Sequence, residues 1–242
     1  MKLFGWTGKR AEHPICSAVI VAAGSSTRMG GVDKIMAELQ GQSVISHTIR
    51  AFETAECIDE IIAVTRQDLI APIQGEIDKY GFTKVSAVIE GGSTRIESVR
   101  KGLLAVRKDA ALAAIQDGAR PLVTVEVIQN VVAKAQRCHA AAPAVPVKDT
   151  IKVTDEAGKV TATPARESLR AVQTPQVFDR DLLLAAWEKA AQDGKAYTDD
   201  CGAMEGLGIP VYLTEGSEEN LKITTPLDLI LAEEILKRRE QL

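Results

Sequence analysis

Aromatic residues and cysteines are scarce in this sequence. Phe, Trp and Tyr make up 4% of the 242 residues, so the apolar content is mostly Ala, Val, Ile and Leu. That mixture suits buried parallel strands flanked by helices better than a sandwich or a barrel. The cysteines show no C-x-x-C pair and no Cys/His ligand spacing, which argues against a disulfide framework or a structural zinc site. They are Cys16, Cys57, Cys138 and Cys201.

Long apolar runs and an excess of positive charge are also missing. No run of about 18 apolar residues occurs, so we expect no membrane span. Residues 1–14 lack the apolar core of a signal peptide and are expected to be an N-terminal extension. The 29 Lys and Arg against 33 Asp and Glu give a net charge of −4, a poor balance for a nucleic-acid binder. We therefore expect a cytoplasmic protein without nucleic-acid or membrane partners, in which a few placed cations hold any anionic ligand.

Strand-like and helix-like segments alternate along most of the chain. The spacing of apolar residues predicts βαβ units, and hence an α/β fold with a Rossmann-like, mainly parallel sheet flanked by helices. We expect one domain over residues 15–242, with its polar loops at the carboxyl ends of the strands. The predicted strands are 18–23, 61–65, 85–90, 110–116 and 211–214, and the predicted helices are 43–54, 68–80, 93–106, 124–137, 181–192, 199–207 and 226–239.

The alternation breaks at about residues 143–173. Two short segments, 150–154 and 160–163, flank the sequence Asp-Glu-Ala-Gly at 155–158, which predicts a β-hairpin. A hairpin inserted into an α/β domain has few core contacts of its own. It is either a dimer arm or a plain surface excursion.

The first predicted strand runs into a glycine-rich loop, Ala22-Ala23-Gly24-Ser25, that continues to Lys34. Such a loop offers backbone N–H groups to phosphates. Its glycine spacing fits neither the P-loop nor the dinucleotide fingerprint. Arg28 and Lys34 are then the cations available for phosphate oxygens, unless they are solvated charges on a surface loop.

Seven motifs in order give a resemblance to a known family. The first loop resembles A-A-G-x-x-x-R-M-G of nucleotidyltransferases that activate sugar and polyol phosphates. The later motifs resemble the cytidylyltransferase branch: GGSTRIESV (91–99), DGARP (117–121), VKDTIK (147–152), TPQ (174–176), TDD (198–200) and NLKIT (220–224). From about residue 17 to 240 the chain is similar to the 2-C-methyl-D-erythritol 4-phosphate cytidylyltransferase family of the non-mevalonate isoprenoid pathway. Gly118 departs from the commoner Ala of the family's D-A-A-R-P.

The resemblance implies an enzyme that transfers CMP from CTP to a polyol phosphate and releases pyrophosphate. Such an in-line displacement depends on positioning and electrostatics and needs no covalent nucleophile. By resemblance, the catalytic residues are Arg28, Lys34, Arg166 and Lys222. The CTP-binding residues are Ala22, Ala23, Gly24, Ser25, Arg28, Lys34, Gly92, Ser98 and Asp117. The substrate-binding residues are Asp117, Arg120, Thr150, Arg166, Thr198 and Lys222.

The family resemblance also implies partners. We expect magnesium or another divalent cation held mainly by the CTP phosphates, with no metal site of the protein's own. We also expect a homodimer formed through the hairpin arm, which supplies some of the substrate-binding residues to the other subunit.

Some alternatives stay open at this point. Ribitol-5-phosphate cytidylyltransferases share nearly every CTP motif, and a non-catalytic nucleotide-binding regulatory module could have the same fold. An NAD oxidoreductase would need the missing fingerprint. Asp117 could simply cap the following turn, and Thr150 and Thr198 could have local structural roles. The end of the chain at Leu242 leads us to expect no second catalytic domain of the kind found in bifunctional relatives.

Overall fold

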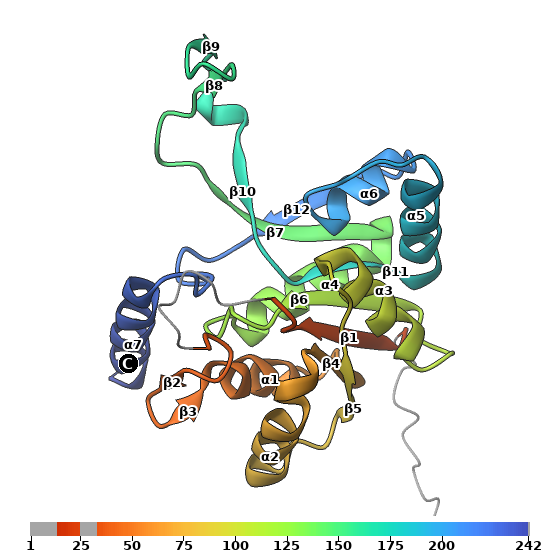
Figure 1. Ribbon diagram of the computed structural model, residues 1–242, viewed down its shortest axis with the longest axis vertical. Coiled ribbons are helices and arrows are strands. Elements are labelled where there is room, and N and C mark those ends of the chain that lie inside the picture. The colour runs from red at the N-terminus through yellow and green to blue at the C-terminus, as the bar shows by residue number, and fades with distance from the viewer. Residues whose placement is uncertain (1–13, 25–32, 242) are drawn as a thin grey trace, which may run out of the picture.

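A single large sheet organises the protein (Figure 1). The computed structural model describes residues 14–24 and 33–241. The sheet has the order β10-β7-β11-β6-β1-β4-β5, and β12 also pairs with β7. Its strands are β1 (Cys16–Val21), β4 (Glu60–Thr65), β5 (Val85–Glu90), β6 (Leu112–Asp117), β7 (Ala140–Pro146), β10 (Arg170–Val172), β11 (Gln176–Asp179) and β12 (Tyr212–Glu215).

Helices cover both faces of the sheet, which explains why its central strand β1 is buried and mostly apolar on both faces. Ala18 and Ile20 of β1 pack into one apolar cluster, and Val19 between them packs into the other. This is the alternation expected of a strand buried on both faces. The first cluster lies under α1 (Val44–Thr54), α2 (Ile70–Tyr80), α4 (Val125–Cys138) and α7 (Pro226–Glu240); the second lies under α3 (Arg95–Ala105), α5 (Arg180–Gln192) and α6 (Asp200–Gly206).

The predicted fold class is confirmed, with one half of the sheet more mixed than the sequence suggested. β1 pairs in parallel with β4 and β6, and β4 with β5. β11 pairs antiparallel with β6 and β7, whereas β12 runs parallel to β7. None of the helices in the described part of the chain has both the length and the apolar composition needed to cross a bilayer.

Strands β7, β10 and β11 were not predicted. β7 reads AAAPAVP, with Val145 as its one β-branched residue and no aromatic residue, so it has little of the composition by which strands are recognised. Its first five residues are nevertheless buried in the sheet. The short hairpin of β2 (Glu38–Leu39) and β3 (Gln42–Ser43) was missed for its length.

The predicted hairpin is present and projects away from the sheet (Figure 1). β8 (Val153–Thr154) and β9 (Val160–Ala162) pair antiparallel, with Gly158 at a φ of 80° in the connecting turn. The chain leaves the main sheet at the end of β7 and returns to it at β10, and these two strands pair antiparallel. We call residues 147–169 the arm; residues 143–146 and 170–172, which we had expected to belong to it, are strands of the sheet.

Candidate active site

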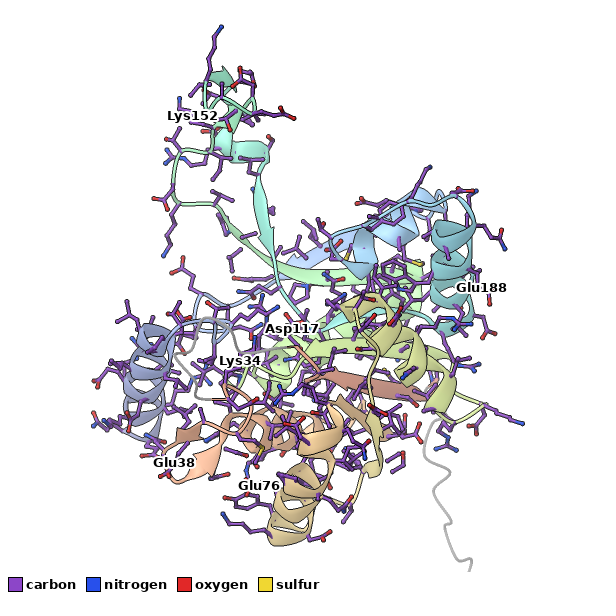
Figure 2. The ribbon with its side chains drawn as sticks, in the orientation of Figure 1. Lys34, Glu38, Glu76, Asp117, Lys152 and Glu188 are labelled. Atoms are coloured by element: carbon purple, nitrogen blue, oxygen red, sulfur yellow. The ribbon has the colours of Figure 1, made fainter. Side chains whose placement is uncertain are left out.

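A cleft of about 330 Å³ opens at the carboxyl ends of the central strands. This is the position where ligands bind in open α/β sheets. Figure 2 shows Lys34 and Asp117 close to this edge, near the middle of the molecule. The cleft is lined by Val21, Ala22, Ala23, Gly24, Lys34, Ile35, Gly92, Ser93, Thr94, Arg95, Ser98, Asp117, Ala119 and Lys222.

Small residues make one wall of the cleft. The chain leaves β1 at Ala22, whose N–H donates to the carbonyl of Val64 at 2.7 Å. A Cβ placed on Gly91 would lie 2.7 Å from the Cβ of Ala23, closer than two side chains can approach. The absence of side-chain bulk therefore lets the loops after β1 and β5 lie side by side.

The turn after β5 is fixed by hydrogen bonds from the first turn of α3. Gly92 N–H donates to Ser98 Oγ at 3.0 Å, and that hydroxyl donates to the carbonyl of Thr94 at 2.9 Å. Thr94 also caps α3 by accepting from Glu97 N–H at 3.1 Å. Ser98 thus orients the turn, and its hydroxyl keeps one acceptor lone pair for a ligand.

Asp117, at the end of β6, is surrounded by three cations. Its Oδ2 lies 2.8 Å from Lys222 Nζ and 3.6 Å from Arg120 Nε, and its Oδ1 lies 3.8 Å from Arg95 Nε. Burial by itself would raise the pKa of Asp117, but the positive charges of Lys222, Arg95 and Arg120 outweigh it and lower the pKa. The carboxylate is therefore ionised and holds the cations at the cleft.

Arg95 and Asp200 form an ion pair that the sequence analysis did not assign to the site. Arg95 Nη2 lies 2.7 Å from Oδ2 of Asp200, a side chain with no exposed surface. Trp187 Nε1 donates to the other carboxylate oxygen at 3.1 Å. Arg95 belongs to the motif GGSTRIESV and Asp200 to the motif TDD. Membership of these motifs was the one sequence signal that could have assigned the two residues to the site.

The TPQ and TDD motifs meet in the structure. Gln176 Nε2 donates to Asp199 Oδ2 at 2.9 Å, and Gln176 Oε1 accepts from Cys201 N–H at 3.2 Å. Asp199 also caps α6 through Gly202 N–H at 2.9 Å. Gln176 thereby fixes the start of α6, directly after Thr198, which does not line the cleft.

A second set of buried contacts holds Arg120 and the segment that carries Lys222. Arg120 Nη1 donates to the carbonyl of Asn220 at 2.6 Å. Asn220 Nδ2 donates to the carbonyl of Thr174 at 3.0 Å, and Thr174 Oγ1 accepts from Asp117 N–H at 3.1 Å. The residues of three motifs are therefore connected around one carboxylate.

The sequence analysis also did not assign Arg66 to the site. Arg66 contacts Gly24 and Asp33, the described residues on either side of the first loop. Its Nη2 lies 2.7 Å from Asp33 Oδ2, and its Nη1 lies 3.4 Å from the carbonyl oxygen of Gly24. It follows β4 directly, at the same edge of the sheet as the cleft. Ser25 and Arg28, which we assigned to CTP, lie outside the described residues.

The structure brings most of the proposed site residues together. Those lining the cleft are Ala22, Ala23, Gly24, Lys34, Gly92, Ser98, Asp117 and Lys222, and Arg120 lies beside Asp117. Thr150 and Arg166 are on the arm, where Arg166 Nη1 donates to the carbonyl of Lys148 at 2.8 Å. No arm residue is among those that line the cleft of the same chain.

The described residues provide no metal site of their own. Within residues 14–24 and 33–241, no three His, Cys, Asp or Glu side chains come together as metal ligands would. Asp117 is the carboxylate of the cleft, and its oxygens already face Lys222, Arg95 and Arg120. The residues that the structure describes around the cleft therefore do not form a site for a resident metal ion.

Known proteins similar to this chain share both its sequence and its fold. A curated 2-C-methyl-D-erythritol 4-phosphate cytidylyltransferase from Alkaliphilus oremlandii is 45% identical, over 93% of this chain and 96% of its own length. One from Caldanaerobacter subterraneus is also 45% identical, over 92% of this chain and 99% of its own length. The crystal structure of 4-diphosphocytidyl-2C-methyl-D-erythritol synthase from Anaerococcus prevotii matches with a TM-score of 0.83 and 33% identity, covering 93% of this chain and 96% of that one.

A structure of the bifunctional IspDF from Campylobacter jejuni is similar as well. The match covers 89% of this chain but 53% of the bifunctional one, at 27% identity and a TM-score of 0.73. The model of the family IspD: 2-C-methyl-D-erythritol 4-phosphate cytidylyltransferase matches residues 16–238. With motifs, fold and cleft in agreement with these matches, the chain belongs to the IspD family.

Proposed function

We propose that this protein transfers CMP from CTP to 2-C-methyl-D-erythritol 4-phosphate, giving 4-diphosphocytidyl-2-C-methyl-D-erythritol and pyrophosphate. The reaction supplies an isoprenoid precursor. The observation that carries this function is the family match over residues 16–238, which includes every residue of the described cleft. The cluster of Lys222, Arg120 and Arg95 around Asp117 gives that cleft the charge an anionic substrate pair requires.

The chemistry is an in-line displacement at the α-phosphorus of CTP. An oxygen of the polyol phosphate forms the new P–O bond, while the bond from the α-phosphorus to the oxygen bridging to the β-phosphate breaks and pyrophosphate leaves. Two anions must approach each other, so cations have to neutralise charge in the transition state. We assign this role to Arg28 and Lys34 at the triphosphate. Lys222, held by Asp117, and Arg166 fix the attacking phosphate.

We infer that the divalent cation enters bound to CTP. Two observations support this: the described residues include no cluster of metal ligands, and Asp117 already has three cationic neighbours. Magnesium is commonly held through substrate phosphates together with water. When bound, it would neutralise part of the triphosphate charge, and the protein's own cations act on the remainder.

We infer that two copies associate through the arm. The arm projects from the sheet and carries three exposed large apolar side chains, Ile151, Val153 and Val160. Thr150 and Arg166 lie on the arm and do not line the cleft of their own chain. Both observations support an arm that reaches the cleft of a second subunit. The cytoplasmic location stays a prediction.

The test is a comparison of the two polyol phosphates. The purified protein is incubated with CTP, magnesium and either 2-C-methyl-D-erythritol 4-phosphate or ribitol 5-phosphate, and pyrophosphate release and product mass are measured. We expect turnover with the methylerythritol phosphate. Turnover with ribitol phosphate alone would show the alternative cytidylyltransferase, and CTP binding without turnover of either would show a non-catalytic nucleotide-binding module.

A further inference from the structure

A fully buried carboxylate lies directly behind the nucleotide cleft. Asp200, the first residue of α6, has no exposed surface. Its Oδ2 accepts from Arg95 Nη2 at 2.7 Å and its Oδ1 from Trp187 Nε1 at 3.1 Å. Both oxygens therefore have donors inside the protein, so Asp200 acts on the cleft only through a neighbour.

Arg95 is that neighbour. It begins α3, lines the cleft, and places Nε 3.8 Å from Asp117 Oδ1 while Nη2 remains on Asp200. A guanidinium is planar and has its donors in fixed directions. Fixing Nη2 of Arg95 on Asp200 therefore determines how close its Nε comes to Asp117.

The two carboxylates compete for the same guanidinium. Without the charge of Asp200, the nearest anion to Arg95 is Asp117, and Coulomb attraction would draw the guanidinium onto it. Asp117 is also the partner of Lys222 at 2.8 Å. Arg95 faces Oδ1 of this carboxylate and Lys222 faces Oδ2. A closer Arg95 would share the charge of Asp117 with the lysine, weaken their pairing and change the cationic surface of the cleft.

We propose that Asp200 is a positioning residue for cytidylyl transfer, holding Arg95 at the edge of the nucleotide cleft so that Asp117 remains paired with Lys222. The inference rests on the proposed function for its kinetic consequence. Its consequence for CTP binding is independent of the polyol. The competing explanation is that Asp200 only ties α3 to α5 and α6.

A double-mutant cycle separates these explanations. CTP affinity is measured by calorimetry, and kcat and KM by pyrophosphate release, for Asp200→Asn, Arg95→Ala and the double variant. Removing one charge of a buried pair is costly, so we expect Asp200→Asn to weaken CTP binding and lower kcat/KM for CTP by about tenfold or more. Because Asp200 acts through Arg95, Asp200→Asn should cause no further loss in the Arg95→Ala background.

Trp187→Phe is the matched control. It removes the other hydrogen bond to the same carboxylate while keeping an aromatic ring in the core, and it leaves Arg95 untouched. We expect it to lower the melting temperature but to leave CTP affinity and kcat/KM within about threefold of the wild type. A loss as large as that of Asp200→Asn would overturn the proposal, because it would show that any weakening of this core contact has the same effect.

Asp200→Glu keeps the experiment decisive if the Asn variant does not fold. It retains the charge but moves the carboxylate by one methylene, so a folded variant should bind CTP more weakly. Wild-type affinity and kinetics in Asp200→Glu, or losses that add in the double variant, would overturn the proposal. Failure of wild-type protein to use the polyol phosphate would contradict the proposed function but leave the binding cycle interpretable.

Discussion

Lys222 Nζ lies 2.8 Å from Asp117 Oδ2, so the segment before α7 is joined to the end of β6 inside the cleft. Asp117 is 8% exposed, whereas the side chain of Lys222 is 39% exposed and can contact a substrate. The buried carboxylate of Asp117 thereby holds the ammonium group of Lys222 in place at the cleft.

The pair predicts the effect of Lys222→Ala. The substitution leaves Asp117 with two more distant guanidinium groups and removes a cation from the place we assign to the attacking phosphate. We expect kcat/KM for the polyol phosphate to fall about a hundredfold, with a smaller change in CTP affinity. Lys237→Ala on the exposed part of α7 is the control and should have wild-type kinetics. Equal losses in CTP affinity and in polyol phosphate use would argue against this assignment.

The lowered pKa of Asp117 predicts a pH dependence of stability. Burial opposes ionisation, but Lys222, Arg95 and Arg120 lower the pKa of the folded state below the unfolded value. The stabilisation is therefore fully present above the unfolded pKa and is lost as the pH falls through the folded pKa. Asp117→Asn should be less stable than the wild type at neutral pH, and the difference should shrink in acid. Melting curves over the acidic range measure this; a constant difference would contradict it.

Lys34 lines the cleft and predicts a large kinetic effect. Loss of one donor to a transition state commonly costs a hundredfold or more in turnover. We expect Lys34→Ala, and likewise Arg28→Ala, to lower kcat by about that factor while the melting temperature stays near the wild-type value. Lys108→Ala, an exposed lysine outside the cleft, is the control. Wild-type turnover in both Lys34→Ala and Arg28→Ala would refute their roles.

Two glycine variants distinguish close packing from backbone freedom. A Cβ on Gly91 would lie 2.7 Å from both Ala23 Cβ and Ser98 Oγ, whereas a Cβ on Gly75 in α2 would meet no atom within 4 Å. Gly91→Ala should weaken CTP binding and destabilise the fold by about 1–3 kcal/mol. Gly75→Ala should stabilise it by up to about 1 kcal/mol through helix propensity. Calorimetry with CTP and thermal unfolding measure both, and unchanged CTP affinity in Gly91→Ala would contradict the prediction.

Subunit mixing tests the role of Arg166. If the arm serves the partner's cleft, a hybrid of one Lys34→Ala chain and one Arg166→Ala chain has one fully defective cleft and one intact cleft. Random mixing should then restore about a quarter of wild-type activity from two inactive variants. If Arg166 serves its own cleft, every cleft stays defective and mixing restores nothing. Size-exclusion chromatography of the mixture checks that dimers are present.

The parts predictable from sequence are those with local signals. The apolar run of β1, the capped helices and the loops after β1, β5 and β6 indicated both the α/β fold and the edge that carries the cleft. β7 could not be found because Ala and Pro around a single Val give little strand signal, and its burial depends on neighbouring strands and on helices α4 and α6.

The contacts of the site that could not be predicted from sequence are those between residues far apart in the chain. Arg95 and Asp200 are 105 residues apart, and each one alone resembles a helix-start residue beside a loop. Their pairing depends on how α3 packs near α5 and α6, which no single segment specifies. For the same reason Arg66, a charge after a strand, gave no sign that it reaches both Gly24 and Asp33.

The pairing of β7 with β10 has a consequence for how the arm could evolve. Val145 lies opposite Ala171 and Pro146 opposite Arg170. This register sets the direction in which the arm leaves the sheet. Strand side chains alternate with a period of two, and a one-residue insertion in either strand would turn every following side chain to the opposite face. Length changes should therefore be tolerated at the hairpin tip, around Gly158, and selected against at the two strands from which the arm departs.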